Sequence, residues 1–86
     1  MTTTDRRTEL RQRIARCEAT QADYEAIAAS RTRQLEQLEP GDPETRDAAR
    51  ELLRQLIHAD NCAAEAARYA MYARNELADL NAKRAA

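Results

Sequence analysis

The chain of 86 residues has no Trp and no Phe, and it contains only one Gly, two Pro, two Cys and three Tyr. So few helix breakers leave room for long helices, and the abundant Ala, Arg, Glu and Leu side chains lose little freedom in a helix. Two cysteines are too few for a disulfide scaffold, so we expect Cys17 and Cys62 to stay reduced. The net charge of −1 argues neither for nor against a charged partner.

Segments that would mark a membrane protein, a secreted protein or an enzyme are also missing. No apolar run approaches the roughly 20 residues that span a bilayer. The opening MTTTDRRTEL lacks the apolar region of a usual signal peptide. There is no Gly-rich phosphate loop, and two helices cannot enclose a ligand cavity of about 300 Å³ or more. The sequence therefore predicts a cytoplasmic protein that is not an enzyme, binds no cofactor and does not contact a membrane.

One strong break in the helical pattern, EPGDPE at residues 39–44, divides the chain. Pro40 disfavours helix at the residue before it, Gly41 supplies a left-handed position, and Asp42 followed by Pro43 is typical of a helix N-terminus. We expect one helix over about residues 5–39, a turn over 40–42, and a second helix over about 43–83. Because the connection is short, the helices should be antiparallel neighbours. The predicted fold is an all-α, coiled-coil-like two-helix hairpin that forms a single domain over residues 1–86.

Each predicted helix carries a seam of residues spaced alternately by three and four. The seam of the first helix comprises Leu10, Ile14, Cys17, Gln21, Tyr24, Ala28, Arg31, Leu35 and Leu38. That of the second comprises Ala49, Leu52, Leu56, Ala59, Ala63, Ala66, Ala70, Ala73, Leu77 and Leu80. Ile14, Cys17 and Tyr24 are expected to cover the alanines in the middle, and Arg31 to lie opposite Asp47 and Glu51.

The second helix has more apolar surface than the first can cover, since one antiparallel neighbour covers a stripe of only about 100°. Leu53, Ile57, Ala64, Ala67 and Met71 form a second stripe, and Cys62, Tyr69 and Tyr72 form a third patch that points largely away from the first helix. Tyr, Met and Arg are enriched at interfaces, and Arg68 and Arg74 bracket the tyrosines. We therefore predict partner binding through Leu53, Ile57, Cys62, Tyr69, Met71 and Tyr72, with a second copy or another helical protein as the partner.

Two other kinds of site are weaker candidates. His58 and Cys62 have the i, i+4 spacing of metal ligands, but only Glu65 is placed to join them, so no metal site is predicted. The start of the first helix gathers arginines that could meet nucleic-acid phosphates: Arg6, Arg7, Arg11, Arg13 and Arg16. Acidic residues are interleaved with them and no aromatic residue lies nearby to stack on a base. A solvated, salt-bridged helix end is the preferred interpretation, and no nucleic-acid partner is predicted.

The order of TELRQRIARCEATQADY, a DP turn, ARELLRQLIHA and a final YAMYARNEL resembles the small helical-hairpin co-chaperones of bacterial type III secretion systems. The similarity covers about residues 8–80. It implies that the protein binds a helical-repeat chaperone and, through it, helps to keep the needle subunit soluble and monomeric before export. Two alternatives remain: a homodimeric helical regulator, such as a phage-encoded inhibitor of a host protein, and a nucleic-acid-binding hairpin.

Overall fold

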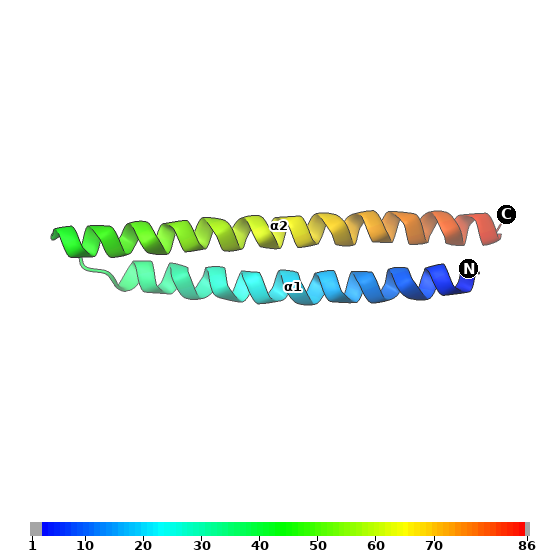
Figure 1. Ribbon diagram of the computed structural model, residues 1–86, viewed down its shortest axis with the longest axis horizontal. Coiled ribbons are helices and arrows are strands. Elements are labelled where there is room, and N and C mark those ends of the chain that lie inside the picture. The colour runs from blue at the N-terminus through cyan, green and yellow to red at the C-terminus, as the bar shows by residue number, and fades with distance from the viewer. Residues whose placement is uncertain (1–2, 86) are drawn as a thin grey trace.

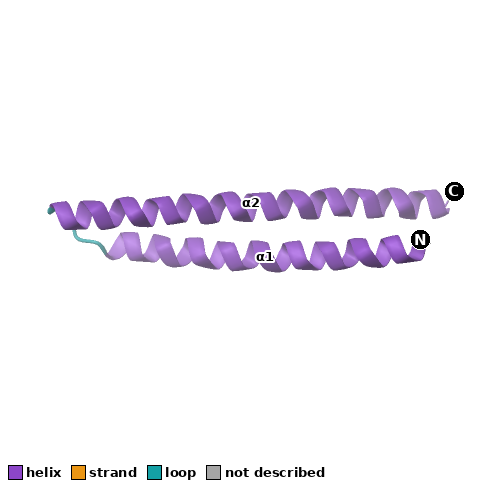
Figure 2. Ribbon diagram, viewed as in Figure 1, coloured by secondary structure: helices purple, strands orange, loops and turns teal. Residues whose placement is uncertain are grey.

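The computed structural model describes residues 3–85, which form two antiparallel helices, α1 (Thr3–Gln37) and α2 (Pro43–Ala85) (Figure 1). The hairpin is 65 Å long and 16 Å across, and the two chain ends lie at the same end of it. No strand occurs among these residues, and a short loop is the one connection between the helices (Figure 2). The predicted all-α helical hairpin is confirmed.

The turn is built by the local chemistry of the EPGDPE segment. Helix α1 ends at Gln37, before the residue that Pro40 constrains. Gly41 has a φ of 141°, a backbone conformation that residues other than glycine rarely adopt. The Thr45 backbone N–H donates to the Asp42 carboxylate at 2.7 Å, and this hydrogen bond lowers the pKa of Asp42 below its usual value. Asp42 is thus the N-cap of α2, and Pro43 is the first helical residue.

The core follows the predicted seam, and it is unequal in its two helices. On α2 the buried apolar residues are Ala59, Ala63, Ala66, Ala70 and Ala73. On α1 only Leu10 and Ala28 are buried, and Leu10 is the largest fully buried side chain among the described residues. Ile14, Cys17 and Tyr24 are half-buried. Alanine lets the helix axes approach closely but removes little apolar area from water.

At the end of the hairpin near the chain termini, arginine side chains of α1 join the two helices. Arg7 is buried, and its guanidinium donates to the Asn81 side-chain oxygen at 3.0 Å and to the Leu80 carbonyl at 3.1 Å. Arg6 pairs with Glu76 of α2, which raises the pKa of Arg6 and lowers that of Glu76. Arg13 donates to Glu9 at 3.4 Å. Much of the arginine-rich start of α1 therefore has an intramolecular structural role.

No ion pair joins Arg31 to Asp47 or Glu51, the residues expected to lie opposite it, within the described part of the chain. Glu51 accepts instead from Arg54 and Gln55 on its own helix. Arg31 donates to Gln34 at 3.2 Å, again within one helix. The helix itself holds side chains at i+3 and i+4 within reach. Arg31 and Glu51 therefore form hydrogen bonds with these neighbours and not with residues of the other helix.

Candidate protein-docking surfaces

The residues predicted to bind a partner keep large exposed areas. The exposed fraction is 46% for Leu53, 58% for Ile57, 53% for Tyr69, 47% for Met71 and 54% for Tyr72. Cys62 is half-buried. Helix α1 therefore leaves most of these apolar side chains accessible, as the sequence predicts. They do not form one surface, however, because they lie on two different sides of α2.

The helical repeat of about 100° per residue separates the two sets, placing Tyr69 and Met71 about 160° apart around the axis of α2. We call the first surface the side stripe, which lies on α2 alone and consists of Leu53, Ile57, Ala64, Ala67 and Met71. Beside this stripe α1 presents charge, since Glu18 pairs with Arg74, which follows Met71 by one turn. An ion pair thus crosses the boundary between α1 and the side stripe at its Met71 end.

The second surface is a groove along the boundary between the helices, which we call the tyrosine groove. It consists of three open pockets, with volumes of about 450, 500 and 360 Å³. Tyr24 lines the first two, and Cys17 and Tyr69 line the first and third, so the pockets are continuous. On α1 the lining is Arg13, Arg16, Cys17, Thr20, Tyr24, Ile27 and Arg31; on α2 the main lining residues are Gln55, His58, Cys62, Glu65, Tyr69 and Tyr72.

Aromatic contacts fix the walls of the tyrosine groove. The rings of Tyr69 and Tyr72 meet edge to face with centroids 6.4 Å apart. Tyr24 and His58 make the same kind of contact across the two helices, also at 6.4 Å. The expectation that Tyr69 and Tyr72 point away from α1 therefore needs correction. Both remain about half exposed, but with Arg13 and Cys17 of α1 they line one pocket.

The contribution of α1 to this groove was not singled out from the sequence. Its lining residues Arg13, Cys17, Thr20, Tyr24, Ile27 and Arg31 follow one another at intervals of three and four, which places them on one helix face. This spacing could have indicated the α1 side of the groove from the sequence alone. Because the row mixes arginine, threonine and apolar residues, it is a weaker signal than the apolar stripe on α2.

The His58–Cys62 pair is present, with the Cys62 Sγ atom 3.6 Å from His58 Nε2. Among residues 3–85, no group of three or more His, Cys, Asp or Glu side chains is arranged to hold a metal ion. The pair belongs to the wall of the tyrosine groove, where His58 also contacts Tyr24.

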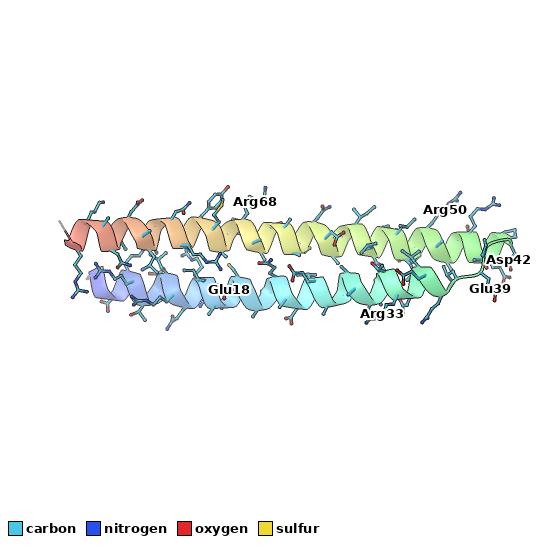
Figure 3. The ribbon with its side chains drawn as sticks, turned by 180° about the vertical axis from the view of Figure 1, so that it is seen from behind. Glu18, Arg33, Glu39, Asp42, Arg50 and Arg68 are labelled. Atoms are coloured by element: carbon cyan, nitrogen blue, oxygen red, sulfur yellow. The ribbon has the colours of Figure 1, made fainter. Side chains whose placement is uncertain are left out.

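The end of the groove nearest the loop carries a positive charge without a carboxylate partner. Arg31 lines the pocket there beside Tyr24 and His58, and its buried Nε atom has no hydrogen-bond partner in the described part of the chain. Arg54 lines the same pocket but is already paired with Glu51. By contrast, Arg33 and Arg68 lie on the outer edges of the hairpin, away from the helix boundary (Figure 3).

Comparisons with protein-family models, with curated proteins and with solved structures find no significant match to this chain. Within residues 3–85 neither helix has a stretch both long and apolar enough to cross a membrane.

Proposed function

We propose that the protein is a co-chaperone of a bacterial type III secretion system, acting in the cytoplasm by docking on a helical-repeat chaperone that holds the needle subunit. The resemblance of the sequence supplies this class of partner. The observation that carries the docking role is the tyrosine groove, a continuous concave surface to which both helices contribute.

The dimensions of the tyrosine groove suit a helix of the partner. From Arg13 to Arg31 it follows α1 for about 27 Å, the length of a helix of about 18 residues. Ala59 and Ala66 form part of the floor, so a third helix can approach closely. Tyr24, Tyr69 and Tyr72 supply flat side chains of the kind that dominate binding energy at interfaces. A partner helix laid in the groove would convert the hairpin into a three-helix bundle.

Charge gives the docked helix a direction. Arg31 is held in a largely apolar pocket without an acidic partner in the described residues. An acidic side chain or the negative C-terminal end of the partner helix would satisfy it. The partner helix therefore has an apolar face with acidic character at the end that meets the loop side of the groove.

The test is co-expression with the helical-repeat chaperone and the needle subunit of a type III secretion system from the same genome. We expect a stoichiometric complex, and Tyr69→Ala should weaken it about 30-fold, equivalent to ~2 kcal/mol for a hot spot. Met71→Ala is the matched control, because Met71 is about as exposed as Tyr69 but lies on the side stripe. Absence of a complex would reject the co-chaperone role, and equal affinity of both variants would reject the groove as its docking site.

A further inference from the structure

The side stripe is a separate surface from the tyrosine groove, and partner binding in the groove would leave it exposed. Its large side chains lie towards its two ends, with Leu53 and Ile57 at one end and Met71 at the other. Between them lie the exposed Asp60 and Ala64 and the half-buried Ala67. Ile57 and Met71 each lie two helical turns from Ala64, so the stripe is nearly symmetric about that residue.

The accessible area shows how much surface remains to be covered. The chain exposes 6368 Å². A compact monomer of 9.7 kDa is expected to expose about 5,100 Å². Because the hairpin is an elongated body of 65 × 16 × 16 Å, this surplus of roughly 1,200 Å² is spread along both helices, and it exceeds the ~800 Å² that each partner contributes to a stable interface.

A two-fold axis uses the symmetry of the stripe. In an antiparallel pair of α2 helices related by an axis close to Ala64, the Leu53 and Ile57 end of each copy meets the Met71 end of the other. The alanines face one another at the centre, where small side chains let the helix axes approach. The antiparallel arrangement also sets the helix macrodipoles favourably. The charged Asp60 lies within the stripe between Ile57 and Ala64, whereas Arg74 lies on its edge towards α1 and pairs with Glu18.

We propose that the side stripe binds a second copy of this chain, giving a homodimer in which the two α2 helices pack antiparallel about Ala64. The dimer is a four-helix assembly with α2 of each copy in the middle and α1 outside. The tyrosine groove of each copy stays open, so self-association and partner binding use different residues.

The test is the mass of the purified full chain by light scattering over a range of concentrations. We expect a mass of two chains for the natural protein. Ala64→Arg should weaken the dimer by at least about 100-fold, because it places two like charges together at the axis. Ala19→Arg is the matched control, since Ala19 is an exposed alanine of α1. Arginine favours helix at both positions, so both variants should keep the helical content of the natural chain.

Three results would overturn the proposal: a mass of one chain at every concentration, a dimer that survives Ala64→Arg, or equal loss of the dimer in Ala64→Arg and Ala19→Arg. A dimer that is broken by Tyr69→Ala but not by Ala64→Arg would place the contact in the tyrosine groove and would also reject the stripe. None of these measurements involves the chaperone, so they distinguish failure of this proposal from failure of the co-chaperone role.

Discussion

Helix α2 carries mainly small side chains in the middle of the face that packs on α1, and large apolar side chains on the faces that point to solvent. The middle of the inner face consists of alanines, of which Ala70 has an exposed fraction of 0% and Ala59 of 1%, and the leucines towards its two ends are half-buried. Outside are leucine, isoleucine, methionine and two tyrosines, each about half exposed. In an isolated globular domain the large apolar residues usually lie inside, because their burial contributes most to stability.

This inversion separates the requirements of folding from those of binding. The alanine face sets a close approach of the helices and fixes which residues face each other, but it removes little apolar area from water. The large residues outside add little to the isolated hairpin, so their stabilising contribution depends on a protein that covers them. A chain of this size buries only about 60% of the surface that it exposes when unfolded, so the isolated hairpin should be marginally stable.

The comparison between inside and outside is tested most strongly at Leu10. Leu10→Ala should lower the free energy of unfolding by about 2–5 kcal/mol, because it empties the site of the largest fully buried side chain. Leu53→Ala removes the same atoms from a half-exposed site and should have a much smaller effect. Chemical denaturation of both variants in the Ala64→Arg background excludes any contribution from self-association. Equal losses would mean that inside and outside positions contribute alike to the fold.

The alanine face can be tested in the opposite direction by adding volume. Ala70→Leu should destabilise the hairpin by about 1–3 kcal/mol, since the longer side chain has no space where Ala70 is fully buried. Ala26→Leu makes the same change at an exposed position of α1 and should leave the stability nearly unchanged. Thermal unfolding followed by circular dichroism compares the two. A stabilised Ala70→Leu variant would show that the alanines leave unfilled space rather than setting the helix spacing.

Features with local causes were predictable from the sequence. The turn is defined by Pro40, Gly41, Asp42 and Pro43. Each of these residues shapes its own backbone or that of a near neighbour in the sequence. The seam of α2 was predictable as well. Its spacing of three and four residues defines one face of the helix, whichever residues of α1 lie opposite. All five alanines from Ala59 to Ala73 on that seam are buried.

Features that depend on pairing between distant residues were not predictable. Arg7 was grouped with the arginines that could meet nucleic acid, yet it is buried against Leu80 and Asn81, more than 70 positions along the chain. The tyrosine groove was missed for the same reason, since it exists only once the Tyr24 face of α1 lies beside the Tyr69 face of α2. Spacing within one helix identifies a face, whereas the register between helices decides which faces meet.

The smallest expected effect concerns the exposed polar contacts, and it depends on pH. The side-chain hydrogen bonds from Arg6 hold the pKa of Glu76 below its usual value of 4.5. The stability from this pair is therefore fully present above pH 4.5 and is lost as the pH falls through the lower folded-state pKa. Glu76→Gln should reduce the loss of thermal stability in acid.

Glu65→Gln is the control variant. Glu65 lies on the same helix but has no ion pair in the described residues, so this substitution should leave the loss unchanged. Some acid dependence should persist in both variants, because hydrogen bonds also lower the pKa values of Asp42 and Glu51. If Glu76→Gln follows the natural protein at every pH, the Arg6–Glu76 pair contributes nothing measurable to the acid dependence of the hairpin.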